Sequence, residues 1–198
     1  MSKDNIFISN MHSNYQVNLI DKILCNIQEN NQPGIVVDYS GELIQKHYDQ
    51  GRGDIIFNSS HAKSSGWDFL ADCRHEDEIG DFFNRLIQYS TQDNTVNIEL
   101  RDISNMKIIF IDSINFLRET GSFSFKNLKM MLVRGDHQEI LQNLAGKKSI
   151  KVLNNTKNDL IPALLRLITY IPKLEDFDTN QQNSLFSINN YFESLKQG

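Results

Sequence analysis

The hydrophobic pattern of this chain changes near residue 64, and that change limits its fold more than any other feature. Before it, short apolar runs at Ile6–Ser9, Gly34–Asp38 and Asp54–Phe57 predict strands that alternate with helical segments. Strands separated by helices favour a parallel sheet with right-handed crossovers. After it, apolar residues recur at helical spacing almost to the C-terminus. The sequence therefore predicts a small α/β piece followed by a larger all-helical piece.

Local signals set the boundaries of these pieces. The continuous run Gly34–Asp38 is typical of a strand buried on both faces. We expect an α/β piece over residues 1–64, an all-α domain over 65–178, and a linker with a closing helix over 179–198. Apolar spacing and helix-ending glycines predict further helices and helix ends at Tyr15–Gln28, Glu42–Tyr48, Gly121, Gly146, Asp159–Ile171 and Ile188–Leu195.

Composition places the chain among ordinary soluble globular proteins. Of its 198 residues, 39% are hydrophobic and 23% are charged. The longest apolar stretch, Leu160–Ile171, contains Arg166 and is too short to span a bilayer, so we expect no membrane insertion. Two cysteines, Cys25 and Cys73, cannot form a disulfide framework, and we expect both to be buried thiols of a reducing cytosol.

Charge is distributed unevenly along the chain. The net charge is −5, which argues against general nucleic-acid binding. Residues 123–173, however, hold nine Lys and Arg residues against three Asp and Glu residues, a local balance of +6. Solvated helix faces explain such a segment equally well, and so does an acidic protein partner. The basic candidates for contact with a nucleic acid or another partner are Lys126, Lys129, Arg134, Lys147, Lys148 and Lys151.

Several residues that resemble functional groups have simpler structural explanations. Asp38 stands at a strand end, where a turn-forming role is commoner than catalysis. The cluster Cys73–Glu78 lacks the second ligand pair of a structural metal site, so its acids are expected to open a helix. Trp67 is expected to anchor the junction between domains rather than to stack on single-stranded DNA. Phe123 and Phe125, beside two lysines, are explained equally well by core packing.

Three stretches, taken in order, resemble the conjugative coupling proteins of the TraD/TrwB type. They are GIVVDYSGELIQKHYDQGRGDIIFN, SSGWDFLADCRHEDEIGDFFNRLI, and the helical region from MKIIFIDSINFLRETG to FSINNYFE. The resemblance implies an α/β fragment of a RecA-like P-loop fold with a short parallel sheet, joined to a larger all-α inserted domain and mostly helical overall. Members of this family are hexameric inner-membrane pumps that link a DNA–relaxase substrate to a type IV secretion channel. Their helical domain contacts DNA and the relaxosome.

The family's phosphate-binding loop is altered at every diagnostic position. Ser9 and Asn14 stand in place of the two glycines, Tyr15 replaces the lysine, and Gln16 replaces the residue that holds Mg²⁺. Glycines let backbone N–H groups wrap the phosphates, and lysine supplies the balancing charge. A tyrosine cannot replace an ammonium group. We therefore expect a degenerate site without ATP hydrolysis, catalytic residues, metal or cofactor.

Two hypotheses of function follow from these observations. The first is a truncated coupling-protein-like domain that contacts DNA and relaxosome or relaxase proteins, because the chain opens at the first core strand and closes before the region of the family's Walker B acid. The alternative is a protein–protein docking module for an intact coupling ATPase or secretion component, with no role in nucleic-acid binding. The expected protein partners also include a companion fragment. Both hypotheses imply a cytoplasmic protein, which partners would hold at the inner face of the bacterial inner membrane.

Overall fold

The computed structural model describes residues 14–30, 32, 34–38, 40–58, 61–92, 100–134, 137–155, 160–170, 174–179 and 185–197. The chain forms two compact units, residues 1–55 and 56–198. The described residues are mostly helical and contain one short parallel sheet of two strands, in agreement with the predicted fold class. The predicted three-part division at residues 64 and 178 stays a prediction.

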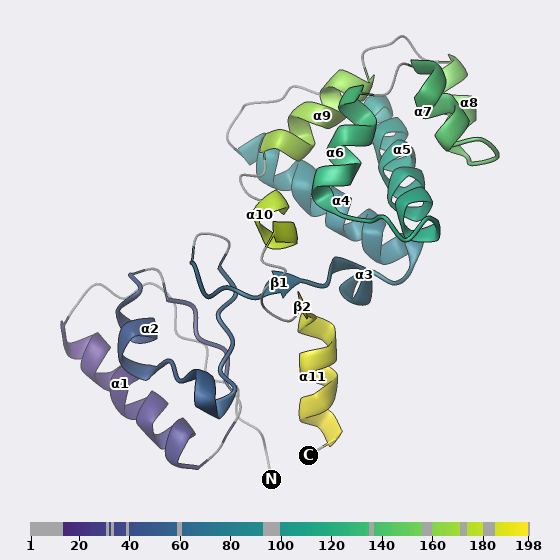
Figure 1. Ribbon diagram of the computed structural model, residues 1–198. Coiled ribbons are helices and arrows are strands. Elements are labelled where there is room, and N and C mark those ends of the chain that lie inside the picture. Colours follow the sequence, from purple (N-terminus) through teal and green to yellow (C-terminus); the bar gives the residue numbers. More distant parts are fainter. Residues whose placement is uncertain are drawn as a thin grey trace. The chain divides into compact units, whose positions relative to one another are not determined.

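The first unit contains α1 (Asn14–Glu29), α2 (Glu42–His47) and a 3₁₀ turn, Gln50–Arg52 (Figure 1). Both predicted helices are thus confirmed. Polar contacts join them: Asp21 Oδ1 lies 2.9 Å from His47 Nε2, and Asp21 Oδ2 accepts a hydrogen bond of 2.9 Å from Lys46 Nζ. These two hydrogen bonds hold the pKa of Asp21 below its usual value. The prediction that Cys25, on α1, is buried is wrong, because its side chain is exposed.

Asp38 has the turn-forming role that its position predicts. Its Oδ1 atom accepts hydrogen bonds from the backbone N–H groups of Ser40 and Gly41, at 3.1 and 2.9 Å. Its Oδ2 atom accepts from the N–H groups of Leu43 and Ile44 in the first turn of α2, at 3.0 and 3.1 Å. The carboxylate therefore satisfies helix-end donors that have no partner within the helix. Gly41 supplies the positive φ of 78° that this turn requires.

The predicted buried strand at Gly34–Asp38 is wrong. Residues 34–38 belong to no strand, and the side chains of Ile35, Val36 and Val37 are 61%, 46% and 57% exposed. Within the described part of the chain, the predicted strand Asp54–Phe57 makes one bridge, which is parallel and joins Ile56 to Ser64. A strand is buried on both faces only when neighbouring strands and helices cover it. The predicted strand Ile6–Ser9 lies outside the described residues.

The second unit begins with a short strand and continues as a helical bundle (Figure 1). Pro162 is the third residue of its helix, as expected for a proline in a first turn. Gly121 and Gly146 follow helix ends with φ values of 63° and 80°, as their predicted role requires. The elements are β1 (Gly66–Trp67), α3 (Phe69–Asp72), α4 (Glu76–Gln92), α5 (Leu100–Glu119), α6 (Phe125–Arg134), α7 (His137–Asn143), α8 (Ser149–Asn155), α9 (Leu160–Tyr170), α10 (Leu174–Thr179), β2 (Leu185–Phe186) and α11 (Ile188–Gln197).

Helix α5 is the centre of this bundle, because α4, α6, α8 and α9 all pack against it. Its core residues Met106, Phe110 and Ile114 are at most 1% exposed, and they lie in one cluster with Ile79 and Phe83 of α4. The rings of Phe83 and Phe110 are 5.4 Å apart. Apolar residues three and four positions apart thus form a continuous buried stripe, which is the pattern that identifies these helices in the sequence.

The two ends of the bundle are joined by the parallel sheet. Gly66 pairs with Leu185, and Trp67 pairs with Phe186. The Asp72 carboxylate strengthens this junction by accepting hydrogen bonds from the Trp67 indole N–H at 2.7 Å, from the Ser187 hydroxyl at 2.6 Å, and from two N–H groups at the start of α11. Burial opposes ionisation of Asp72, but these hydrogen bonds prevail and lower its pKa.

Candidate nucleic-acid interface

The altered phosphate-binding loop lies mostly outside the described residues. Ser9 is not described, and Asn14, Tyr15 and Gln16 form the first turn of α1, with side chains that are not described. The chemistry of this loop therefore stays a prediction from the sequence.

Three of the predicted contact residues, Lys126, Lys129 and Arg134, lie on α6. The side chain of Arg134 is not described. Lys129 Nζ donates to Glu175 Oε1 of α10 at 2.6 Å, so its charge is already balanced within the fold. Lys126 is exposed, and its backbone N–H donates to Asp178 Oδ2 at 2.8 Å.

Asp178 closes the N-terminus of α6. Its Oδ1 atom accepts from the backbone N–H of Phe125 at 3.0 Å, which complements the bond from Lys126. Burial raises the pKa of Asp178, and the two N–H donors offset this effect only in part. The positive end of the α6 dipole and its free N–H groups are thus used by a carboxylate of the same chain. Lys129 therefore has a structural explanation, because its side chain holds α10, whereas Lys126 contacts α10 through its backbone N–H.

The other three predicted contact residues lie in and after the turn that joins α7 to α8. Lys147 forms an ion pair with Glu119 at the end of α5, and Lys148 Nζ lies 3.1 Å from Glu76 Oε2 at the start of α4. Lys151, on α8, is exposed and has no carboxylate partner among the described residues.

The turn is fixed in position by a buried carboxylate. The backbone N–H of Ser149 donates to Asp112 Oδ2 at 2.7 Å, and both residues are buried. Asp112 belongs to α5 and acts as an N-cap for α8, which satisfies a backbone donor at the start of that helix.

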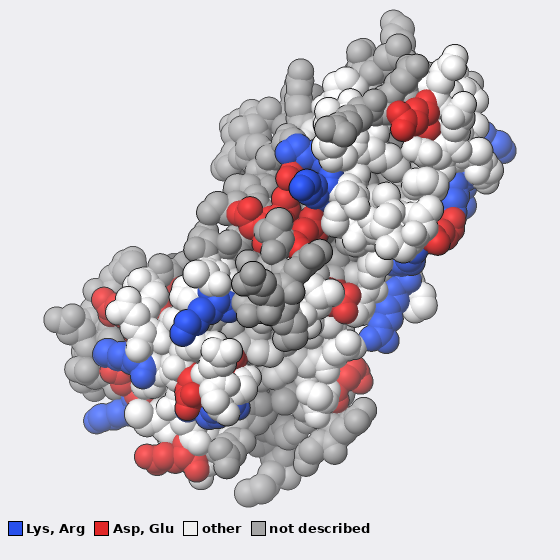
Figure 2. All heavy atoms as spheres, viewed as in Figure 1, with Lys and Arg blue, Asp and Glu red and all other residues white. Residues whose placement is uncertain are grey.

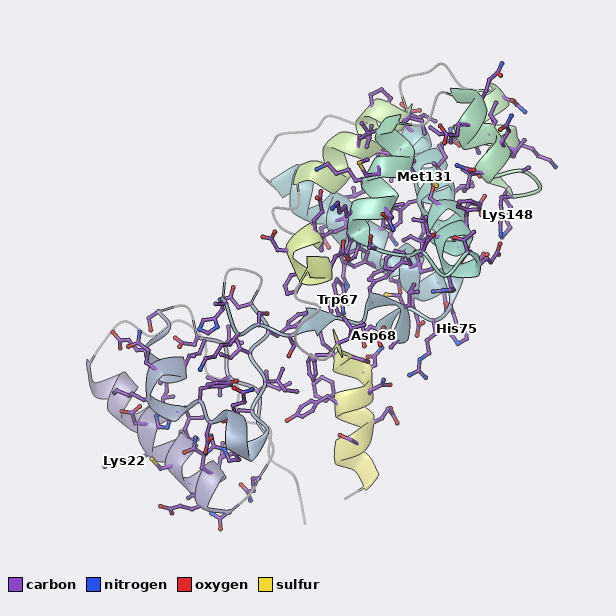
Figure 3. The ribbon with its side chains drawn as sticks, viewed as in Figure 1. Lys22, Trp67, Asp68, His75, Met131 and Lys148 are labelled. Atoms are coloured by element: carbon purple, nitrogen blue, oxygen red, sulfur yellow. The ribbon has the colours of Figure 1, made fainter. Side chains whose placement is uncertain are left out.

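An exposed arginine, which the sequence does not single out, extends this group. Arg74 lies two residues before Glu76, and its guanidinium donates to Asn190 Oδ1 at 2.6 Å without any carboxylate partner among the described residues. Figure 3 shows Lys148 and His75 on the same side of the bundle. The ion pair of Lys148 with Glu76 also brings it close to the segment that contains Arg74. We call Arg74, Lys147, Lys148 and Lys151 the basic edge. Figure 2 shows a row of blue atoms with red between them along this side.

The local charge of this segment is smaller than the sequence predicts. Glu76, Glu119 and Glu175 lie outside residues 123–173, yet the fold brings one to each of Lys148, Lys147 and Lys129. The six predicted contact residues form two groups, one on α6 beside α10 and one at the start of α8. Arg74 was hidden in the sequence by the acidic residues that follow it.

Trp67 is partly buried among aromatic rings where β1 meets the bundle, and its predicted role as an anchor between domains stays a prediction. Its ring lies 5.1 Å from that of Phe69, 5.6 Å from Phe82 and 5.9 Å from Phe125, measured between centroids. Phe123 and Phe125 also pack against Phe69. These rings therefore stabilise the bundle base near β1, as Figure 3 shows for Trp67.

Metal and membrane sites find no support in the described residues. None of their His, Cys, Asp and Glu side chains form a group of three or more that would hold a metal ion. The acids of the Cys73–Glu78 cluster open α4 as predicted, and Glu78 Oε2 accepts from the backbone N–H of His75 at 2.9 Å. Cys73 is buried, which raises the pKa of its thiol to about 11. None of the described helices is both long and apolar enough to cross a bilayer.

Comparison with known proteins identifies relatives of the whole helical region. Residues 16–198 match the family model of the type IV secretion-system coupling protein DNA-binding domain. One similar solved structure is the plasmid coupling protein TrwB in complex with a non-hydrolysable GTP analogue, at 17% identity over 88% of this chain, with a TM-score of 0.61. Another is the bacterial conjugative coupling protein TrwBdeltaN70 in an unbound monoclinic form, at 16% identity over 90% of this chain, with a TM-score of 0.62.

These structural similarities establish the fold of the chain. The chain spans about 40% of the length of each of the two solved chains. A search of curated proteins gave no significant match. The predicted resemblance to the coupling-protein family and the predicted fold class are confirmed.

Proposed function

Since this chain belongs to the family of type IV secretion-system coupling protein DNA-binding domains, we propose that its helical unit binds the phosphate backbone of DNA through the basic edge. The observation that carries this proposal is the ion pair between Lys148 and Glu76, which brings the turn before α8 close to the segment that contains Arg74. Figure 2 shows a row of blue atoms with red between them on one side of the bundle. Lys151 and Arg74 have no carboxylate partner among the described residues. Their charges are therefore available to phosphate groups.

The chemistry of this edge favours binding that does not depend on base sequence. Ammonium and guanidinium groups bind phosphates mainly through charge, and they release counterions from DNA as they do so. The aromatic residues that would stack on bases, Trp67 and Phe125 among them, are packed in the bundle. We expect similar affinity for DNA of any sequence and a steep loss of affinity as salt rises.

Fluorescence anisotropy with single- and double-stranded DNA across a salt series tests this proposal. Replacing Lys147, Lys148 and Lys151 by glutamine is expected to weaken binding about tenfold or more at low salt, and to reduce the salt slope by up to about 1 per contact. Replacing Lys126 and Lys129 by glutamine is the matched control on α6. Equal losses from both sets would contradict the assignment to the basic edge, and salt-independent binding would contradict backbone contact.

We also propose that this segment does not hydrolyse ATP. The support is chemical: Tyr15 and Gln16 stand where the loop needs an ammonium and a Mg²⁺ ligand. Titration calorimetry with Mg·ATP is expected to show no binding, and a submillimolar dissociation constant would contradict the proposal. Contacts with relaxase and relaxosome proteins, and a cytoplasmic place at the inner membrane, stay predictions.

A second candidate function is docking on another polypeptide, such as an intact coupling ATPase or a companion fragment. The exposed side chains of Ile35, Val36 and Val37 favour it, because this apolar segment belongs to no strand and a strand of another chain could pair with it. Sedimentation of this chain mixed with the intact coupling ATPase of the same secretion system tests it. We expect a complex that Val36→Pro weakens and Val36→Ala preserves, since proline removes a backbone donor. Sedimentation as two separate species would contradict docking.

A further inference from the structure

Both lysines in the turn before α8 face a carboxylate that another helix supplies. Lys147 pairs with Glu119 of α5, and Lys148 Nζ lies 3.1 Å from Glu76 Oε2 of α4. The two acids are 28 and 72 residues away from their partners in the sequence. We infer that Glu76 and Glu119 are built-in competitors of DNA, which hold these two lysines of the basic edge until phosphates displace them. This inference rests on the proposed function of the edge.

The two ion pairs are placed where a polyanion can displace them. The side chains of Lys148 and Glu76 are 75% and 53% exposed, and in the other pair Glu119 is 61% exposed while Lys147 is 25% exposed. Exposed ion pairs contribute little because water and salt screen them. A DNA backbone presents many phosphates at close spacing, and its binding gains the entropy of released counterions. The lysines can therefore exchange one anionic partner for another at small cost.

Glu76 is held in position by more than its lysine. The side-chain amide of Asn115 on α5 donates to Glu76 Oε1 at 3.3 Å, and Arg118 Nη1 lies 3.4 Å from Asn115 Oδ1. Arg118 in turn donates to the backbone oxygen of Arg74 at 3.0 Å. The carboxylate would thus stay in the basic edge after Lys148 leaves it. Its charge then opposes the approach of phosphates.

The start of α8 does not depend on either ion pair. The hydrogen bond from Ser149 to Asp112 Oδ2 fixes the first turn, and Leu144 and Leu153 on either side of it are 0% and 4% exposed. Loss of an ion pair therefore frees a lysine side chain while the backbone that carries it stays in place. The consequence is a reserve of DNA affinity that Glu76 and Glu119 withhold.

Neutralising these two acids tests the inference. In salt-series anisotropy with double-stranded DNA, Glu76→Gln and Glu119→Gln are each expected to raise affinity about twofold to fivefold, because both carboxylates are exposed and such ion pairs are weak. The double variant is expected to show a salt slope steeper by up to about 2, one for each freed lysine. Glu175→Gln is the matched control, since it removes the same charge and frees Lys129 on α6, away from the basic edge.

A change in stability cannot imitate this result, because the two substitutions affect their helices in opposite ways. Glu76 lies in the first turn of α4, where an acid is favourable, and Glu119 is the last residue of α5, where an acid is unfavourable. Thermal unfolding is therefore expected to show a lower melting temperature for Glu76→Gln and no decrease for Glu119→Gln. Affinity is expected to rise in both.

The outcomes separate the two proposals. A gain in both edge variants that exceeds the gain in Glu175→Gln supports the inference. If the wild-type chain binds DNA and the edge variants match it or the control, the inference is overturned and the proposed function stands. If neither the wild type nor any variant binds, both are overturned.

Discussion

Large apolar side chains are buried in the helical unit but exposed in residues 34–38 of the first unit. In the bundle, Phe83, Met106 and Ile109 are completely buried, whereas Ile35 and Val37 of the first unit are 61% and 57% exposed. Apolar burial is the main source of folding free energy, so a unit that buries its large side chains can be stable by itself. The contrast teaches that the bundle has a core of its own, while residues 34–38 lack a covering partner among the described residues.

A large-to-small substitution in the core of the bundle is expected to have the largest effect on stability. Phe83→Ala is expected to lower the free energy of unfolding of the bundle by about 3–5 kcal/mol, because a large ring is replaced by a cavity. Denaturation by urea, followed by circular dichroism, measures it. The control Phe83→Leu is expected to cost less, since it keeps most of the apolar volume. A loss below about 1 kcal/mol for the alanine variant would mean that the core readily collapses around the gap.

The junction gives the next largest effect. Asp72→Ala is expected to cost about 2 kcal/mol at pH 7, since it removes an acceptor shared by the Trp67 indole and the start of α11. The pKa of Asp72 is lower in the folded state than its ordinary value of 3.8. Its contribution to stability is therefore present above pH 3.8 and is lost as the pH falls through the pKa of the folded state. The difference between wild type and variant should therefore shrink in acid. Hydrogen exchange of α11 amides measures the local part of this loss.

Asp178 is expected to show the opposite pH dependence with a smaller effect. Burial raises its pKa above the ordinary value of 3.8. The stability that Asp178 contributes is therefore greatest below pH 3.8 and declines as the pH rises through the pKa of the folded state. An asparagine side chain at this position cannot ionise and can still accept from one of the two N–H groups. We therefore expect Asp178→Asn to change stability by at most about 1 kcal/mol at pH 7.

Unfolding measured at pH 3 and at pH 7 checks the sign of this effect. The stability of Asp178→Asn relative to wild type should improve as pH rises. A relative loss over the same range would show that the two N–H donors, rather than burial, control this carboxyl group.

The exposed segment gives the smallest expected change. Ile35→Lys is expected to alter stability by no more than about 0.5 kcal/mol, because the side chain it replaces is mostly exposed. Thermal unfolding checks this, with Phe83→Ala as the reference for a buried site. A large loss would show that Ile35 is covered in solution, and it would remove the contrast between the two regions.

Local signals account for the parts of the fold that the sequence predicts well. The helices α1, α2 and α11 follow from apolar spacing, and Gly121 and Gly146 end helices because their backbone needs a positive φ. Asp38 also acts locally, on donors within six residues. The burial of the run Gly34–Asp38 was mispredicted because burial depends on neighbours that a run of residues does not specify.

The candidate site was harder to predict because its chemistry is non-local. The sequence singles out Lys147 and Lys148, but their acidic partners come from α4 and α5. Likewise, Asp112 caps α8 from 37 residues away, and Asp178 caps α6 from 53 residues away. No periodicity or spacing rule links such pairs. A charge count along the chain therefore overstated how much of the basic segment is free to bind.

The parallel pairing of β1 with β2 has a further consequence for how such a chain changes during evolution. Residues 66–67 and 185–186 lie side by side, so everything between them leaves and rejoins the rest of the chain at one place. A host protein that accommodates two adjacent strands can gain or lose the whole bundle without altering the spacing of its own elements. We therefore expect the bundle to fold when it is inserted into an unrelated protein, in place of a loop that connects two neighbouring strands.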